Sequence, residues 1–369
     1  RRTCSASEGA THGGLLDGSY TWGEPTIGDA VKLTDPGTAD IAISNPVSRV
    51  YAGIEVAKII DDGGFAGVAD PGQRFSGEWS CRYRGEDPVS GTWSSTGSAA
   101  GTVATLTGDA GHVLVGSECS VTEDTSFGAP SDDPSYRWDA TPSFHGVTVE
   151  AGEPNRLTVT NTLRRDTGRV TVAKELAGET GGYAPSGSFA GFSVTARCYL
   201  HDPDESGRLE ATVAVRPGES ATAIDGVPYG WTCTVSEGSF PSPSQLRDAS
   251  YAWDLQTVAF GNGTPTTVVT AGNDAPQAVV TNSIRRVYGQ VAVSKAYGGG
   301  TADAVRPGTT FTGAYACTYG QERYTGTWSV TGDGPATLTG DTLIPFTAEC
   351  TATEDAPSDS SLLDTSYTW

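Results

Sequence analysis

Residues 75–83 read Phe-Ser-Gly-Glu-Trp-Ser-Cys-Arg-Tyr, and every second residue of this stretch is glycine, cysteine or aromatic. Residues 311–319 repeat the pattern as Phe-Thr-Gly-Ala-Tyr-Ala-Cys-Thr-Tyr. A period of two is typical of a β-strand with one buried face. Similar short segments, bounded by Gly, Pro, Asp and Ser, continue along the chain. About seven or eight strands in about 116 residues predict an all-β, immunoglobulin-like sandwich, with a jelly roll or a barrel as the alternative.

The chain contains an internal repeat about as long as one small domain. Its clearest marker is a cysteine followed four residues later by a glutamate, and the cysteines lie 115, 114 and 117 residues apart. The four copies are Cys4 with Glu8, Cys119 with Glu123, Cys233 with Glu237, and Cys350 with Glu354. A Ser-Tyr-x-Trp motif recurs in the same phase, ending at Trp22, Trp138, Trp253 and Trp369. We expect Tyr136 and Trp138 of this motif to pack in a core.

These markers divide the chain into tandem domains arranged head to tail as a rod. We expect the C-terminal part of a truncated repeat at 1–49, complete repeats at 50–165 and 166–286, and the N-terminal part of a truncated repeat at 287–369. The junctions between them are short. We also expect the 369 residues to be part of a longer array. The alternative is that neighbouring chains complete each other's end domains.

The charge excludes several classes of partner. With 23 basic and 44 acidic residues the net charge is -21, so a role that depends on neutralising phosphate groups is not expected, and nucleic acid is not an expected partner. The chain has no run of eighteen apolar residues, and we expect no membrane span in this segment. We found no motif for turnover catalysis or for a cofactor.

Seven cysteines indicate disulfides formed outside the cytoplasm. Each repeat with two cysteines provides one pair, and Cys4 has no partner. The predicted pairs are Cys81 with Cys119, Cys198 with Cys233, and Cys317 with Cys350. Metal ligands normally cluster, whereas these cysteines occur singly, so we expect no metal site.

Lysine is the most informative residue type. The chain has four lysines against nineteen arginines, and three of the four, Lys58, Lys174 and Lys295, occupy the same place in the repeat. Arginine stays protonated in proteins, whereas a buried lysine can lose its proton and become a nucleophile. The recurrence therefore indicates a position that needs an amine.

Strand phase predicts that this amine points into the core together with an acid and an amide. Lys58 is in phase with Val56, Glu123 with Val121, and Asn161 with Val159. Lys174, Glu237 and Asn282 form the same set in the next repeat. Buried charges are costly, so the three groups must satisfy one another. They either form a hydrogen-bonded cluster that fixes the register, or they react, with the amine attacking the amide and releasing ammonia.

The order of lysine in a first strand, glutamate in a middle strand and asparagine in a last strand resembles the collagen-adhesin B-repeat (CnaB-type) domains of Gram-positive surface adhesins and pilins, which carry intramolecular Lys–Asn isopeptide bonds. The resemblance extends over the whole chain as repeats. It implies bonds Lys58–Asn161 and Lys174–Asn282, with Glu123 and Glu237 as catalytic acids. Lys295 with Glu354, and Glu8 with Asn45, are incomplete sets. The implied location is extracellular, on the surface or in the cell wall of a Gram-positive bacterium.

The chain departs from the family pattern at two points. A cysteine stands four residues before the glutamate, where the family often has an aromatic residue, and the family's Ala-Pro-x-Gly-Tyr stretch is not clearly present. The disulfide is therefore an addition, more typical of actinobacterial relatives.

Two classes of function follow from these patterns. The first is a structural stalk or filament of an adhesin or pilus-like protein, whose partners are neighbouring repeats of the same or an adjacent chain. The second is a module that binds a glycan, a host protein or another cell-surface ligand. The second repeat has Gly207-Arg208-Leu209 where we align Gly91-Thr92-Trp93 and Gly326-Thr327-Trp328, and a binding site could explain this divergence. The sequence favours the stalk.

Overall fold

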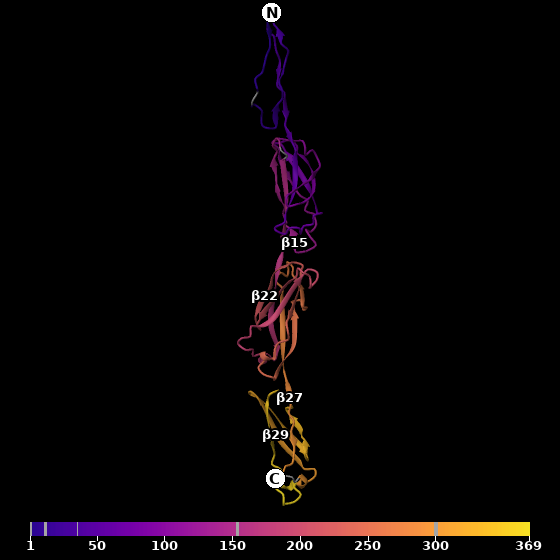
Figure 1. Cartoon of the computed structure of the whole chain (residues 1–369), viewed down its shortest axis with the longest axis vertical. Coiled ribbons are helices and arrows are strands. Elements are labelled where there is room, and N and C mark those ends of the chain that lie inside the picture. The colour runs from indigo at the N-terminus through magenta and orange to yellow at the C-terminus, as the bar shows by residue number, and fades with distance from the viewer. Residues whose placement is uncertain (1, 11–12, 35, 153–154, 299–301) are drawn as a thin grey trace. The chain divides into compact units, whose positions relative to one another are not determined.

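The computed structural model describes residues 2–10, 13–34, 36–152, 155–298 and 302–369. The chain divides into two compact units, Arg1–Asp166 and Thr167–Trp369. Figure 1 shows the ribbon of the whole chain. The described residues contain β-strands and short 3-10 turns but no α-helix. The prediction of an all-β chain of tandem sandwiches is confirmed.

The first unit begins with segment 1–49, whose short strands pair in antiparallel twos: β1 with β4, β2 with β6, and β3 with β5. The strands are β1 (Thr3–Cys4), β2 (Tyr20–Trp22), β3 (Thr26–Ile27), β4 (Val31–Lys32), β5 (Ile43–Ser44) and β6 (Val47–Arg49).

Segment 50–165 completes the first unit and forms a sandwich. One sheet has the order β12-β10-β9-β14-β17 and the other β11-β8-β18-β15, with β16 also on β18 and a small β13-β7 pair beside them. The strands are β7 (Tyr51–Ala52), β8 (Ile54–Asp61), β9 (Arg74–Arg82), β10 (Val89–Thr96), β11 (Thr102–Val103), β12 (Thr105–Leu106), β13 (Val113–Leu114), β14 (Glu118–Val121), β15 (Tyr136–Trp138), β16 (Ser143–His145), β17 (Val147–Thr148) and β18 (Asn155–Arg165).

The second unit begins with another sandwich, segment 166–286. Its sheets have the orders β22-β19-β26-β24 and β21-β20-β23-β25. The elements are β19 (Thr167–Gly178), η1 (Thr180–Gly182), β20 (Phe192–Tyr199), β21 (Leu209–Val215), β22 (Ser220–Pro228), β23 (Thr232–Glu237), η2 (Pro243–Gln245), β24 (Tyr251–Ala259), β25 (Thr266–Val268) and β26 (Gln277–Arg286).

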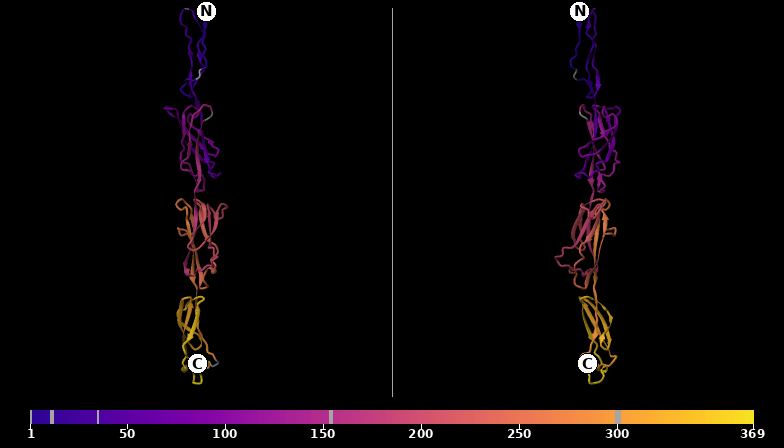
Figure 2. Two further views of the ribbon diagram at one scale, coloured as in Figure 1. Left: turned by 90° about the vertical axis from the view of Figure 1, so that its left-hand side faces the viewer. Right: turned by 45° about the vertical axis from the view of Figure 1, so that its right-hand side comes forward.

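Segment 287–369 contains one four-stranded sheet, β32-β30-β29-β34, and the pairs β27-β33 and β28-β31. The elements are β27 (Tyr288–Gln290), β28 (Ser294–Lys295), η3 (Ala302–Ala304), β29 (Thr310–Tyr319), β30 (Glu322–Thr331), β31 (Gly334–Pro335), β32 (Thr337–Gly340), β33 (Leu343–Pro345), β34 (Glu349–Glu354) and η4 (Asp359–Ser361). Figure 2 gives two further views of these strands.

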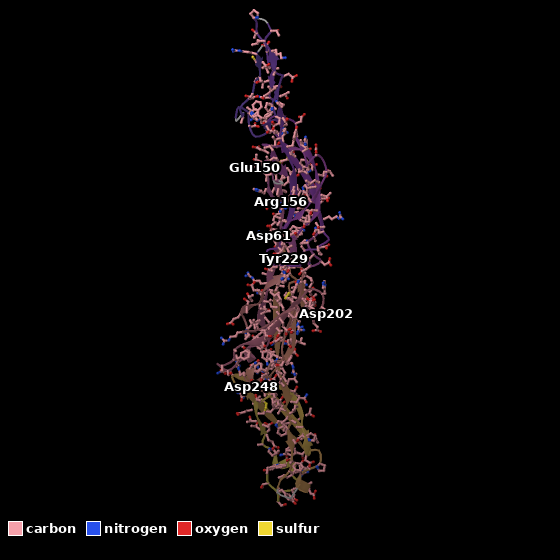
Figure 3. The ribbon with its side chains drawn as sticks, turned by 45° about the horizontal axis from the view of Figure 1, so that its top comes forward. Asp61, Glu150, Arg156, Asp202, Tyr229 and Asp248 are labelled. Atoms are coloured by element: carbon pink, nitrogen blue, oxygen red, sulfur yellow. A yellow bond between two sulfur atoms is a disulfide. The ribbon has the colours of Figure 1, made fainter. Side chains whose placement is uncertain are left out.

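The alternating segments form the predicted strands, with side chains pointing in turn to the core and to solvent. In β9, Phe75, Gly77, Trp79 and Cys81 are buried, and the alternate residues Ser76, Glu78 and Ser80 are more exposed. Charged side chains such as Asp61, Arg156 and Asp202 lie at the surface (Figure 3). In the core, Trp138 packs against Phe75, as predicted for the Ser-Tyr-x-Trp motif.

Each predicted cysteine pair forms a disulfide between directly opposed residues of neighbouring antiparallel strands. Cys81 of β9 faces Cys119 of β14, and the Cα atoms are 4.0 Å apart. The other two pairs are Cys198–Cys233 and Cys317–Cys350. Cys4 is free. Each disulfide therefore fixes the register of the strand that leads to the glutamate of the Cys-x-x-x-Glu motif.

Strand register corrects our alignment of the second repeat. Leu209 faces Cys198, whereas Trp93 faces Gly77, so the residue equivalent to Trp93 is Val213, which faces Val194. The repeats therefore fill the same core position with two different pairs of residues. Segments 50–165 and 287–369 pair a tryptophan with a glycine, and segment 166–286 pairs two valines. The divergence is an exchange of core volume between the two strands.

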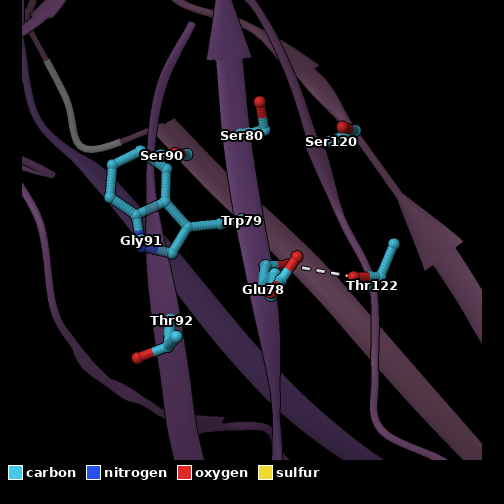
Figure 4. A pocket seen from close by; sticks show the side chains of 8 residues that line it. All are labelled: Glu78, Trp79, Ser80, Ser90, Gly91, Thr92, Ser120 and Thr122. Atoms are coloured by element: carbon cyan, nitrogen blue, oxygen red, sulfur yellow. Dashed lines mark hydrogen bonds between the residues drawn. The ribbon is translucent and has the colours of Figure 1, made fainter.

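A similar difference occurs at the next inward-facing residue pair along the same two strands. Trp79 faces Gly91, and its indole lies beside that glycine (Figure 4). Trp79 Nε1 donates to the Thr107 carbonyl at 3.1 Å, and Trp93 Nε1 donates to the Thr122 carbonyl at 2.8 Å. The second repeat has Ala196 facing Ala211 at this point. The glycines leave room for the indoles and for the carbonyls that the indoles bind.

The first prediction concerns Gly77. A Cβ atom at this position would collide with the Thr122 carbonyl oxygen, with Trp93 and with the backbone of Glu123. We expect Gly77→Ala to destabilise segment 50–165 by about 1–3 kcal/mol, the range for overpacked cores. Amide hydrogen exchange of β9 in the full chain measures this. Gly85→Ala is the control, because a Cβ there meets nothing within 4 Å. Equal protection in both variants would contradict this account of the packing.

Candidate functional site

The two complete repeats each bring a lysine, a glutamate and an asparagine together in the core. In segment 50–165, Lys58 lies on β8 and Asn161 on β18, and these first and last strands are parallel neighbours. Lys58 faces Val159, and Asn161 faces Ile60, so the two functional side chains are offset by two residues on adjacent strands. Glu123 follows the end of β14 in the opposite sheet.

The first site is closed to solvent. Lys58 Nζ lies 3.0 Å from Glu123 Oε1, and both side chains have an exposed fraction of 0%. Asn161 is 2% exposed. Lys58 Nζ also lies 4.5 Å from the centre of the Phe75 ring, which covers the amine from the neighbouring sheet.

The second site has the same construction with more hydrogen bonds. Lys174 Nζ, on β19, donates to Glu237 Oε2 and to the Val280 carbonyl, each at 3.2 Å. Asn282 Nδ2, on β26, donates to Glu237 Oε1 at 3.0 Å. The leaving nitrogen of the amide thus faces the carboxyl group. Phe192 covers the amine at 4.6 Å.

The incomplete sets are more open. Lys295 Nζ lies 2.8 Å from Glu354 Oε1, and the side chains are 13% and 33% exposed. Phe311 lies 4.7 Å from this amine. In segment 1–49, Asn45 Nδ2 donates to Glu8 Oε1 at 2.7 Å. Lys295 and Asn45 belong to different units.

Burial shifts the ionisation of the first site toward neutral partners. Burial lowers the pKa of Lys58, against the opposing effect of the Glu123 charge. Burial raises the pKa of Glu123, against the effects of Lys58 and Asn161. The pKa of Lys174 is lowered for the same reason as that of Lys58. A neutral amine beside a protonated acid is the form that can attack an amide.

Both sites contain buried amide oxygens without a hydrogen-bond partner among the described residues. Among the described residues, neither Asn161 Oδ1 nor Asn282 Oδ1 has a hydrogen-bond partner, although both are buried. An unpaired buried acceptor costs about 1–3 kcal/mol.

Sequence reasoning missed the aromatic ring beneath each amine. Phe75, Phe192 and Phe311 each stand six residues before the first cysteine of a disulfide, so the signal was present in the repeat. It also missed Trp93, whose bond to the Thr122 carbonyl holds the backbone next to Glu123. The equivalent bond in the last segment joins Trp328 Nε1 to the Thr353 carbonyl at 3.0 Å.

The described residues contain no group of acidic, histidine and cysteine side chains that could hold a metal ion. Across the same residues, no helix has the length and apolar character needed to cross a membrane. A hollow of about 370 Å³ lies on the outer face of β9, β10 and β14, and hydroxyl groups of Ser80, Ser90, Thr92, Ser120 and Thr122 line it together with Glu78 (Figure 4).

Comparison with known proteins gives one family match and several similar structures. The family described as "Domain of unknown function (DUF5979)" matches residues 54–164, 170–285 and 291–369. No curated protein matches the chain.

The similar structures include a major pilin from Streptococcus pyogenes, with 14% identity and a TM-score of 0.29 over 63% of this chain and 99% of the pilin. A Mobiluncus mulieris adhesin described as containing disulfide, isopeptide and ester cross-links has 13% identity and a TM-score of 0.24, covering 58% and 86%. Two B repeat units of the collagen binding protein of Staphylococcus aureus have 13% identity and a TM-score of 0.26, covering 93% and 89%.

The second prediction is a pH dependence. In an Asn161→Ala variant the Lys58–Glu123 pair stays unreacted. Because the pKa of Glu123 is raised, the folded chain keeps a proton that the unfolded chain releases above 4.5, so the stability contributed by this group falls as the pH rises from 4.5. Because the pKa of Lys58 is lowered, the folded chain lacks a proton that the unfolded chain holds up to 10.5, so the stability contributed by this group rises as the pH approaches 10.5. The pair therefore contributes least stability between these two values.

The measurement is guanidinium unfolding of the full chain, followed through the Trp93 indole NMR signal. The reference variant combines Lys58→Met, Glu123→Gln and Asn161→Ala, and the difference between the two pH profiles isolates the pair. A difference profile with no minimum between pH 4.5 and pH 10.5 would contradict these directions.

Proposed function

The chain belongs to the family described as "Domain of unknown function (DUF5979)", and from this premise we propose that it is a structural stalk whose complete repeats are crosslinked internally by isopeptide bonds. Lys58 joins Asn161, with Glu123 as the acid. Lys174 joins Asn282, with Glu237 as the acid. The observation that carries the proposal is the meeting of an amine, an acid and an amide in a closed core, twice in one chain.

The chemistry is a transfer of the asparagine acyl group from ammonia to lysine. The neutral Nζ of lysine attacks Cγ of asparagine beside the protonated glutamate, which faces the amide nitrogen in the second site. The new C–N bond leaves a proton on Nζ, which passes through the carboxyl group to the departing nitrogen. The old C–N bond then breaks, ammonia leaves, and the glutamate ends in its starting form. Lysine and asparagine are consumed, so each site turns over once.

Three properties support a stalk outside the cell. Disulfides in each of three segments fit an oxidising compartment. The reactive residues are sealed in the cores, where a substrate could not reach them. The hollow on β9, β10 and β14 offers no aromatic platform, because its tryptophan, Trp79, is only 1% exposed. A surface adhesin or pilus-like filament of a Gram-positive bacterium is the setting that fits these properties.

The third prediction is a loss of mass. The intact full chain should fall short of its translated mass by two ammonias, and by the six hydrogens lost in three disulfides. Glu123→Gln should restore one ammonia and leave the second site reacted, and Glu237→Gln should do the reverse. Glu118→Gln is the matched control, because Glu118 is an exposed residue of β14, the strand that leads to Glu123, and this variant should restore neither ammonia. An intact mass that shows no loss of ammonia would contradict the crosslink proposal.

The fourth prediction concerns force. Lys58 and Asn161 are 103 residues apart in sequence, and Lys174 and Asn282 are 108 apart, so each bond would bypass most of its repeat. Without the bond, the disulfide still closes 38 of the 103 residues in the first repeat and 35 of the 108 in the second, so 65 or 73 residues could extend, by roughly 230–260 Å at about 3.5 Å per residue. We expect single-molecule pulling to show no extension of that size from either complete repeat. Glu123→Ala should produce one extension of that size per molecule, from the repeat 50–165. Two long events in the unsubstituted chain would contradict the stalk mechanism.

A further inference from the structure

Three inward-facing residues form a row across the sheet that carries Glu123. Gly77 of β9 is the middle residue, and it faces Trp93 of β10 on one side. On its other side lies the backbone that follows β14, so that a Cβ atom at Gly77 would be only 2.8 Å from Glu123 Cα. The indole of Trp93 reaches across the glycine, and its Nε1 donates to the Thr122 carbonyl at 2.8 Å. This carbonyl belongs to the peptide bond that joins Thr122 to Glu123.

The indole makes the shorter of two bonds to this carbonyl. Strand β14 ends two residues before Glu123. Beyond that end, the Thr122 carbonyl accepts the Glu78 N–H at 3.2 Å and Trp93 Nε1 at 2.8 Å. Trp93 is only 1% exposed, so water cannot take the place of the indole. Because the direction of the Glu123 side chain follows the orientation of the peptide plane before it, the indole fixes where the carboxyl group points.

Segment 287–369 has the same row without an amide. Gly313 of β29 faces Trp328 on one side and Glu354 on the other. Trp328 Nε1 donates to the Thr353 carbonyl at 3.0 Å. The sequence of this segment contains no asparagine. The indole therefore holds the backbone of the acid whether or not an amide is present, and the bond is a property of the sheet rather than of the reacting groups.

Segment 166–286 holds its acid in another way. The row there consists of Val213, Val194 and Glu237, and it contains no indole. Strand β23 runs through Glu237 as a regular strand. The carboxyl group accepts hydrogen bonds from Lys174 Nζ and Asn282 Nδ2. Strand pairing and the reacting groups themselves therefore position the acid of this repeat.

A second indole in the same sheet as Trp93 points the other way. Trp79 of β9 is as buried as Trp93, because each is 1% exposed. It lies beside Gly91 of β10 (Figure 4), and its Nε1 donates to the Thr107 carbonyl at 3.1 Å. Thr107 follows β12, at the edge of the sheet away from β14. Loss of this N–H would cost the core one buried bond and leave the backbone of Glu123 untouched.

We propose that Trp93 is a positioning residue for the isopeptide reaction of segment 50–165, and that its indole N–H holds the Thr122–Glu123 peptide so that the carboxyl group meets the amine and the amide. This inference rests on the crosslink proposed above. Segment 166–286 reacts without such a residue. The two crosslinks of one chain therefore depend on different parts of the fold, and a change at Trp93 affects only the first.

The test follows both crosslinks during cell-free synthesis of the full chain in an oxidising mixture. Samples are quenched in acid at timed intervals and digested, and mass spectrometry quantifies the linked peptides that contain Lys58 or Lys174. We expect Trp93→Phe to slow formation of the Lys58 crosslink about threefold to tenfold, the effect of one hydrogen bond, and to leave the Lys174 crosslink unchanged. Trp79→Phe is the matched control and should slow neither crosslink.

Two further measurements separate positioning from packing. Replacing Trp93 by benzothienylalanine, the sulfur analogue of tryptophan, keeps the shape of the side chain and removes the N–H, so it should slow the Lys58 crosslink as Trp93→Phe does. In an Asn161→Ala background, where this crosslink cannot form, Trp93→Phe and Trp79→Phe should lower the free energy of unfolding of the segment by similar amounts. A similar loss of stability with different rates of crosslinking is expected only of a positioning residue.

The outcomes distinguish this inference from the crosslink on which it rests. Equal rates of the Lys58 crosslink in Trp93→Phe and Trp79→Phe would overturn the role of Trp93, and so would an unchanged rate with benzothienylalanine. In both cases the crosslinks themselves would still form. Absence of both crosslinks from the unsubstituted chain would overturn the crosslink proposal, and the role of Trp93 with it.

Discussion

The fold of each complete repeat must accommodate an amine and a carboxyl group inside an apolar core. Lys58 and Glu123 are fully removed from water, and leaving either charge alone there would cost several kcal/mol. Both groups must therefore be held in contact, which requires the two sheets to meet at one fixed distance. The parallel pairing of β8 with β18 supplies Asn161, and the opposite sheet supplies Glu123 and the Phe75 ring. Three features position the backbone that carries Glu123. The disulfide joins its strand to β9, the Trp93 indole binds the Thr122 carbonyl, and Gly77 leaves room for that carbonyl.

Much of this arrangement could be predicted from single residues and their phase. Alternation in residues 75–83 predicted a strand with Phe75, Trp79 and Cys81 inside, and they are inside. The phase of Lys58 with Val56 predicted a buried lysine, because a strand places alternate residues on one face. Phase says nothing about what covers a side chain from the other sheet, so the role of Phe75 emerged only when the two sheets were seen together.

Other features were hidden because they depend on register or on a neighbouring repeat. The loop 200–208 changes the spacing between β20 and β21, and counting from the nearest glycine aligned Leu209 with Trp93 although Val213 is its equivalent. The Ser-Tyr-x-Trp motif was correctly placed in a core through Trp138. The aspartate two residues before its serine accepts a hydrogen bond from a tyrosine of the following segment, Tyr83 or Tyr319, and this contact became apparent only in the structure.

The cross-strand disulfides also decide what happens when a surface loop is cut or altered. Residues 82–118, 199–232 and 318–349 each lie inside a ring closed by one cysteine pair. A single cleavage within such a ring opens the backbone, but the two new ends stay attached through sulfur. The loop 200–208, which is longer than its counterpart 83–88, lies in one of these rings. The sequence of this loop can therefore vary, and its backbone can be cleaved once, while all parts of the chain remain covalently joined.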